Sequence, residues 1–218
     1  MNQEYPQIMD AVILTKSKMR KNEKTGACVT ACDLKSGNLV RFVSDMDGSP
    51  IVSNKFDVLD HLRVKVICPC PIGPQQENLL VDTSSFQKVE PCNKHEIVNI
   101  FQSHCKPNRH DFMADFSYKL DSVESYKHSI EILRVDHLTT ENETSKWNTK
   151  KEKWIAHFHC AFGWRRFFRV TDDQIYKRNG NIGDAYIVAS IPTEPNEYDG
   201  YYYKFVAAIY PLDQPPFT

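Results

Sequence analysis

The chain has 218 residues, of which 41% are hydrophobic and 25% charged, and its formal net charge at pH 7 is −1. This is the composition of an ordinary globular protein, and it excludes a chain that is disordered throughout or of low complexity. The first residues lack the basic and apolar segments of a signal peptide, and no apolar run approaches the ~18 residues of a membrane-spanning helix. Because the seven cysteines are irregularly spaced and no secretory signal is found, we expect reduced thiols and a cytoplasmic protein that does not engage a membrane.

The first third of the chain is predicted to be β structure. Residues 11–15 form a short run of apolar and β-branched side chains that ends in a basic turn. Residues 27–33 and 39–44 are two further strand-like runs joined by a short turn that contains glycine, a pattern typical of a hairpin. Residues 61–67 alternate between polar and apolar side chains and predict another strand, whereas the prolines that follow predict an irregular stretch.

The middle of the chain contains one well-marked helix, predicted over residues 93–105. Apolar residues recur there at helical spacing, and Asn93 is followed three positions later by Glu96, as in a capping box. A weaker helix or a turn is expected near residues 121–128.

The final third is predicted to be β structure again. Five strands are expected, at residues 130–138, 154–160, 165–171, 185–191 and 201–210. Five short strands over roughly 80 residues suit a small Greek-key barrel such as an OB-fold. Because helices and strands do not alternate regularly, the pattern argues against a doubly wound nucleotide-binding sheet.

The sequence carries none of the common catalytic motifs. It contains no phosphate-binding loop, no Gly-x-Gly-x-x-Gly fingerprint and no Gly-x-Ser-x-Gly nucleophile elbow. This argues against an ATPase, a dehydrogenase or an α/β-hydrolase, and we assign no catalytic residue and no cofactor.

Two pairs of residues are candidate metal ligands: His157 with His159, and Cys68 with Cys70. Alternate residues of a strand share a face, so each pair can point in one direction. Neither pair has the Cys-x-x-Cys spacing of a structural zinc site, and satisfied polar groups or buried thiols are the simpler explanation. We therefore assign no metal ligand. Asp172, together with the two histidines, is the basis of an alternative hypothesis, a metal-dependent nuclease.

Basic residues alternate with aromatic ones in residues 164–169, whose sequence is Trp-Arg-Arg-Phe-Phe-Arg. In a regular strand, Arg165, Phe167 and Arg169 share one face, while Arg166 and Phe168 share the other. A protein that binds single strands needs this combination, because cations contact the phosphates and flat rings stack on the bases, at ~1–3 kcal/mol per base. Residues 201–204 alternate similarly. The competing interpretation is a set of core aromatics beside ordinary surface arginines.

The first β region has a basic segment of its own. Lys16, Lys18, Arg20 and Lys21 are predicted to lie just past the first strand, in a loop that borders the binding face of an OB-fold. Arg41 is predicted to face opposite to Phe42, so that Phe42 enters the core and Arg41 is either solvated or directed at a ligand.

The chain also resembles a known family, the dual-OB-domain family of bacteria. The resemblance rests on residues 13–18, 26–33, 37–44, 69–71, 75–82, 170–172 and 203–209. It implies two OB-type barrels and a module that recognises nucleic acid, often in systems of conflict with phage or mobile elements. This sequence departs from the family in its long region 92–149, which includes a charged run at 139–151.

These observations lead to one fold prediction and one leading function. We expect an all-β protein with a helical connection: a first OB-like barrel at 8–90, the connection at 91–129 and a second OB-like barrel at 130–212. We expect a non-catalytic nucleic-acid-binding protein or subunit, with DNA or RNA as its ligand and with a neighbouring gene's product as a further partner. An adaptor that binds only protein is the other alternative. The predicted contact residues are Lys16, Lys18, Arg20, Lys21, Arg41, Arg165, Arg166, Phe167, Arg169 and Tyr202.

Overall fold

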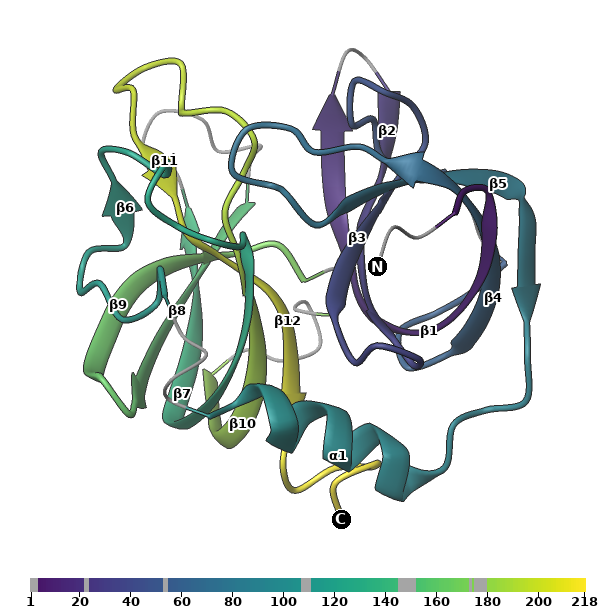
Figure 1. Cartoon of the computed structure of the whole chain (residues 1–218). Helices are drawn as coiled ribbons and strands as arrows, with labels where there is room; N and C mark the ends of the chain where they lie inside the picture. Colours follow the sequence, from purple (N-terminus) through teal and green to yellow (C-terminus); the bar gives the residue numbers. More distant parts are fainter. Residues whose placement is uncertain are drawn as a thin grey trace.

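The computed structural model describes residues 4–21, 24–52, 55–106, 111–144, 152–172, 174 and 180–218. Two closed β-barrels stand side by side, and one helix lies across the junction between them (Figure 1). None of the helical structure in these ranges is long and apolar enough to cross a membrane.

The first barrel is closed by five strands in the spatial order β1-β2-β3-β5-β4. The strands are β1 (Gln7–Lys21), β2 (Lys24–Asp33), β3 (Leu39–Val43), β4 (His61–Pro69) and β5 (Asn78–Lys88). β3 and β5 pair in parallel, and β1 closes the barrel by pairing antiparallel with β4. Alternate residues fill the interior, among them Val29, Phe42 and Val64, which are almost completely buried.

The second barrel repeats this arrangement with its own five strands. They are β7 (Ile130–Thr144), β8 (Glu152–Cys160), β9 (Gly163–Val170), β10 (Gly180–Ser190) and β12 (Phe205–Pro211). The spatial order is β7-β8-β9-β12-β10, with β9 and β12 parallel and β10 closing on β7. In both barrels the third strand therefore pairs with the fifth and the fourth with the first. A five-stranded Greek-key barrel of this kind is an OB-fold, so the predicted fold class is confirmed.

Several strands are longer than predicted, and one strand of the barrels was missed. β1 and β7 each run for 15 residues, well beyond their apolar starts. β5 was not predicted, because the polar residues Asp82 to Ser85 interrupt its apolar pattern. The backbone is irregular at this point: the register against β4 shifts, and the Ser85 hydroxyl accepts a hydrogen bond from the Lys65 amide. Residues 121–128 form turns, with no helix.

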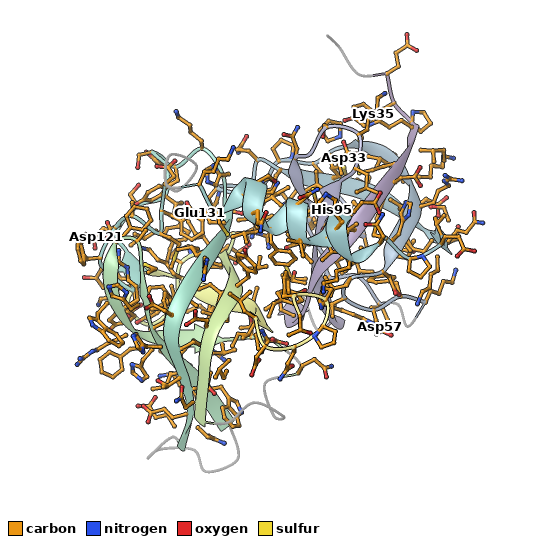
Figure 2. The ribbon with its side chains drawn as sticks, turned by 90° about the horizontal axis from the view of Figure 1, so that it is seen from below. Asp33, Lys35, Asp57, His95, Asp121 and Glu131 are labelled. Carbon is orange, nitrogen blue, oxygen red and sulfur yellow. The ribbon has the colours of Figure 1, made fainter. Side chains whose placement is uncertain are left out.

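The predicted helix is confirmed as α1 (Lys94–His104). Its N-terminus has the expected capping box: the Asn93 side chain accepts from the Glu96 amide at 2.9 Å, and the Asn93 amide donates to the Glu96 carboxylate at 3.0 Å. Figure 2 shows the helix lying across the junction between the barrels, with His95 on its outer side. Its buried side carries Ile97, Ile100 and Phe101.

The two barrels share a hydrophobic core under this helix. Val12 and Leu14 of β1 belong to one buried cluster with residues of β7, β10 and β12 and the buried side of α1. The ring of Phe101 packs against those of Tyr186 and Tyr210, and the Tyr210 hydroxyl donates to the Leu14 carbonyl. A shared core of this kind makes the two barrels one packed unit, because separating them exposes apolar surface to water.

Candidate nucleic-acid interface

The basic and aromatic strand β9 does not alternate as predicted. Phe167 has a positive φ of 65°, and the pairing of β9 with β8 shifts register beside it. The irregularity places one extra residue on the outer side. Arg165 and Phe168 consequently point into the barrel, while Arg166, Phe167 and Arg169 are exposed. The prediction that Arg165 shares a face with Phe167 and Arg169 is therefore wrong.

Arg165 has a structural role in the second barrel. Its side chain is 1% exposed, and its guanidinium donates to the carbonyl oxygens of Phe162 at 2.9 Å and Met113 at 3.2 Å. It also lies 4.4 Å from the centre of the Phe116 ring. A buried guanidinium needs such partners, and in this position Arg165 does not reach the surface.

The same segment of the connection is held by two further buried charges. The Glu131 carboxylate accepts from the amides of residues 111, 112 and 113, and Lys204 donates to the Asp115 carbonyl at 2.9 Å. Burial lowers the pKa of Lys204 to about 8, against the opposing influence of Asp115. Glu131, Arg165 and Lys204 thus fix the segment that leads to Tyr118.

A cavity of about 530 Å³ lies on the outer side of β8 and β9. It is lined by Tyr118, Glu143, Lys153, Ile155, Phe167, Arg169, Pro192, Glu194, Asn196, Tyr203 and Phe205. Ile155 points away from the barrel core and is buried by the walls of this cavity. Both polar and apolar groups therefore face the cavity, as is usual in ligand sites.

The cavity occupies the position where OB-folds bind their ligands. That position is the outer face of the second and third strands, together with the connections between strands 1 and 2 and between strands 4 and 5. In this barrel the second and third strands are β8 and β9. Glu143 and Lys153, which form an ion pair at 3.0 Å, flank the first of these connections, and residues 192–203 belong to the second.

Exposed rings continue along the same face. Phe167 is 57% exposed and Trp164 is 53% exposed. The His157 ring packs edge-on against Phe167, and the His159 ring packs edge-on against Trp164. A bulky side chain at positive φ is strained by about 1–3 kcal/mol, and such strain is concentrated at ligand-binding sites. The strain at Phe167 places an exposed ring at the edge of the cavity.

Arg169 supplies a cation beside this ring. Its side chain is exposed, and its guanidinium makes no hydrogen bond or ion pair within the described ranges. Arg166 is also exposed but lies outside the lining of the cavity. Of the residues predicted on β9, the structure thus brings Phe167 and Arg169 together in the site.

Of the two neighbouring tyrosines 202 and 203, Tyr203 lines the cavity and Tyr202 does not. Tyr202 packs against the core of the barrel, because the short pairing of β11 (Tyr202–Tyr203) with β6 (Lys119–Leu120) turns it inward. Tyr203 donates to the Asp199 carboxylate at 2.5 Å, which raises the pKa of Tyr203 to about 12. Its ring lies 5.9 Å from that of Tyr118. Sequence reasoning missed Tyr118 and Lys153, although the basic run around Lys153 was a usable signal.

The residues predicted in the first barrel lie elsewhere. Lys16 is part of β1, where its ammonium donates to the Phe56 carbonyl at 2.7 Å and lies over the Phe56 ring. Lys18, Arg20 and Lys21 also belong to β1, paired with β2, so the predicted loop is a strand; their side chains lie outside what the structure describes.

Arg41 is buried between the two barrels and is 3% exposed. Its guanidinium donates to Cys28 at 2.7 Å in its own barrel and to the hydroxyls of Ser129 at 2.9 Å and Ser190 at 3.2 Å in the second barrel. Glu77 lies 3.4 Å away. Although burial opposes the charge, the contacts with Cys28 and Glu77 raise the pKa of Arg41 above its ordinary value. Arg41 therefore docks one barrel on the other and is not available to a ligand on the surface.

His157, His159 and Asp172 each have a separate structural partner. His157 pairs with Glu141 at 3.1 Å and His159 with Asp136 at 2.9 Å. The Asp172 carboxylate is buried and accepts from the amides of Gln174 and Ile209, each at 2.9 Å. In the part of the chain that the structure describes, no three His, Cys, Asp or Glu side chains are grouped to hold a metal ion.

A second cavity, of about 340 Å³, lies between the barrels and adjoins the first. The two cavities share Arg169, Pro192, Glu194 and Phe205. Ser17, Cys28, Arg41 and Gln75 line it from the first barrel. The exposed face of β8 and β9 is thus continuous with a recess between the barrels.

Comparison with known proteins agrees with the topology. A search of curated proteins and a search of solved structures gave no match to the chain. The family model described as the dual OB-containing domain matches residues 9–209. This match covers nearly the whole chain and both barrels, and the OB barrel is a fold of the nucleic-acid-binding type. The chain therefore belongs to the dual OB-containing domain family.

Proposed function

We propose that this chain is a non-catalytic protein or subunit that binds single-stranded nucleic acid on the outer face of β8 and β9. The observation that carries the proposal is the cavity in the ligand position of the second barrel, with the exposed residues Phe167 and Arg169 both in its wall. Neither residue is required by the core, which is filled by Phe158, Phe168 and their neighbours.

The chemistry of the face matches the chemistry of an unpaired strand. A base has a flat ring on which Phe167 can stack, and a phosphate is an anion that the guanidinium of Arg169 can contact. Lys153 adds a second cation, partly balanced by Glu143. A base that is paired inside a duplex cannot present its face to a side chain, so the site favours single strands.

The connection between β7 and β8 adds positive charge by its sequence. It contains Lys146, Lys150 and Lys151, at positions whose placement lies outside the described residues. In OB-folds this connection borders the bound strand. We propose that these lysines contribute sequence-independent contacts with phosphate.

We also propose a biological setting, on the basis of the family resemblance: recognition of foreign nucleic acid in a bacterial defence system. The test is the gene neighbourhood: if genes for nucleases, helicases or toxins adjoin the gene for this chain, the setting is supported. Their absence across related genomes argues for a housekeeping binder.

Fluorescence anisotropy tests the proposed binding. Labelled single-stranded DNA, single-stranded RNA and duplex DNA of one sequence are titrated with the protein at salt concentrations from about 50 to 200 mM, a range over which phosphate contacts weaken strongly. We expect the single strands to bind more tightly than the duplex and to lose affinity as salt rises. An absence of salt-sensitive binding to all three ligands contradicts the proposal and leaves a protein as the ligand of this face.

Three variants place the site on the molecule. Phe167→Ala and Arg169→Ala are expected to weaken binding, whereas Arg166→Ala is the matched control. Arg166→Ala removes the same charge from the same strand, but at a position outside the cavity. If Arg166→Ala weakens binding as much as Arg169→Ala does, general charge and not this site accounts for the affinity.

A further inference from the structure

A ribbon of two strands extends from the first barrel beside the recess between the barrels. It consists of residues 17–21 of β1 paired with residues 24–28 of β2. Within the described ranges, β4 pairs with β1 only as far as Val12, so the ribbon end of β1 pairs with β2 alone. Figure 1 shows the ribbon at one end of the first barrel, on the side that faces the second barrel.

The base of the ribbon is part of the recess. Ser17 and Cys28, which are opposite each other in the register of the ribbon, line the recess from the first barrel. Arg169 and Phe205 line it from the second barrel, and both also line the larger cavity on β8 and β9. The larger cavity, the recess and the ribbon therefore form one continuous surface, which crosses from the second barrel to the first.

Beyond this base the ribbon is basic by sequence. Its basic residues are Lys18, Arg20, Lys21 and Lys24. Glu23 is the only acidic residue between positions 16 and 24. The structure describes the backbone of the basic residues and not their side chains. At about 3.4 Å per residue in an antiparallel strand, the four steps from Ser17 to Lys21 extend this charge about 14 Å beyond the recess.

The position of the ribbon distinguishes it from an ordinary charged strand edge. Lysines on an exposed edge also protect a sheet against aggregation, so charge alone does not identify a ligand. Here the basic ribbon begins where the surface that leaves the face of β8 and β9 reaches the first barrel. A single strand longer than that face has further phosphates, and cations along its path can hold them.

The recess suits the bases of such a strand better than its phosphates. Apolar side chains contribute to its lining, namely those of Ile191, Pro192, Phe205 and Ala207. Glu194 lines it as well, and a carboxylate repels a phosphate. Cations lie on both sides of the recess, with Arg169 at its junction with the larger cavity and the basic ribbon on the other side. This order matches a strand whose bases cross the recess and whose phosphates are held before and after it.

We infer that a single strand bound on the face of β8 and β9 continues across the recess onto the β1–β2 ribbon, so that both barrels bind one strand. This inference rests on the proposed function and adds the first barrel to the binding surface. The basic residues of the ribbon then contact phosphates of the nucleotides that lie beyond the second barrel.

Strands of two lengths test the inference. Labelled deoxythymidine strands of about 5 and about 15 nucleotides are titrated with the whole protein, because one OB-fold takes roughly 4–16 nucleotides. The short strand can occupy the second barrel alone, whereas the long strand reaches the ribbon. Each variant is compared with the parent protein on the same strand, so that the larger number of binding registers on the long strand cancels.

The variant that tests the ribbon is the double substitution Lys21→Gln with Lys24→Gln. The matched control is Lys35→Gln with Lys65→Gln, which removes the same charge from exposed positions of the first barrel outside both cavities. We expect the ribbon variant to bind the long strand about tenfold more weakly. Its slope of log affinity against log salt should be smaller by about 1.4, since each phosphate contact of a single strand contributes ~0.7. Its affinity for the short strand should equal that of the parent.

The outcomes separate this inference from the proposed function. If neither strand binds to the parent protein, the proposed function fails. If the ribbon variant binds both strands as the parent does, single-strand binding stands and the path across the barrels is overturned. A loss of equal size for both strands, or for the control variant, shows a general attraction by charge and overturns the path as well.

Photo-cross-linking locates the path in the unsubstituted protein. The long strand carries 4-thiothymidine at its 5′ end or at its 3′ end, and peptide mass spectrometry identifies the adducts. We expect adducts within residues 17–28 from one end and in the peptide that contains Phe167 from the other. Adducts near Phe167 from both ends, with none within residues 17–28, contradict the path.

Discussion

The two barrels have the same topology, but the equivalent face is covered in the first barrel and open in the second. In the first barrel, Arg41 of the third strand is 3% exposed and Cys32 of the second strand is buried in the core that both barrels share. In the second barrel, Phe167 of the third strand is 57% exposed and Arg169 beside it is exposed as well. The face that OB-folds use for ligands is therefore a docking surface in one barrel and an open cavity in the other.

This difference shows that topology does not decide which barrel binds a ligand. The side chains on the face, and what covers them, decide it. In the first barrel the covering element is the second barrel itself, through Ser129, Ser190 and Ile191. The first barrel holds the second in position and forms one wall of the recess, and the face of β8 and β9 remains uncovered.

Replacement of Arg41 is expected to have the largest effect, because it removes the contact by which the first barrel docks on the second. Arg41→Met leaves Glu77 buried without its cation, and removing one partner of a buried pair costs about 3–5 kcal/mol. The free energy of unfolding is measured in denaturant. The control is Arg63→Met, which removes the same charge from the exposed pair with Asp10 at 2.9 Å and should change the free energy of unfolding far less, because exposed ion pairs contribute little to stability. Equal costs for the two variants contradict a docking role for Arg41.

Phe167 tests the open face, because its ring and its backbone have separate effects. Phe167→Ala and Phe167→Gly both remove the ring, and each should weaken single-strand binding about 5- to 150-fold, the equivalent of ~1–3 kcal/mol of stacking. The two variants should differ in stability, since glycine accepts the positive φ of 65° without strain, whereas alanine carries a strain of roughly 1 kcal/mol. Anisotropy and thermal unfolding measure the two effects. Binding that survives both substitutions contradicts a stacking role.

The stability of the second barrel should depend on pH through Lys204, because the ammonium group of this residue is buried in that barrel. Burial lowers its pKa from 10.5 to about 8 in the folded state. Between pH 8 and 10.5 the unfolded chain therefore binds a proton that the folded chain has released, and the contribution of Lys204 to stability rises with pH across this window. Lys204→Met should remove this rise. The measurement is the difference in unfolding free energy between the parent and the variant from pH 7.5 to 10; parallel curves contradict the lowered pKa.

Removal of the N-terminal cap of α1 is expected to have the smallest effect on stability, and the loss should be shared by both barrels. Asn93→Ala leaves the Glu96 amide without its acceptor and should cost ~1 kcal/mol. Because the helix packs on both barrels, they should still unfold in a single transition. Calorimetry checks this, and two separate transitions in the variant contradict the view that the shared core makes them one unit.

The elements that were predicted correctly depend on local signals. The capping box at Asn93, the alternation in β4 and the strand-like runs of the final third are all written in neighbouring residues, where backbone geometry acts directly. β5 was missed because polar residues interrupt its pattern, although the barrel needs it to close between β3 and β4. The extension of β1 into the basic segment was missed because pairing with β2, and not the apolar content of β1, sustains it.

The residues of the site were harder to predict, for a physical reason. Arg41, Arg165 and Arg169 are the same residue type, yet the first two are buried and donate hydrogen bonds to partners far away in the chain, such as Ser129 and Met113. The outward position of Phe167 depends on one irregularity in β9, and that of Tyr203 on a two-residue pairing with β6. One residue of slip exchanges the two faces of a strand.

By itself the sequence determined the order of β, helical and β regions, the family and the stretch around Phe167 that carries rings and cations. Only the tertiary structure decided which barrel keeps its ligand face open. The alternation of polar and apolar residues indicates whether a side chain points away from the core of its own barrel. Whether that side chain is exposed depends on what packs against the outer side of the barrel. In the first barrel that is α1 and the second barrel, whereas the outer side of β8 and β9 keeps its cavity and its exposed rings.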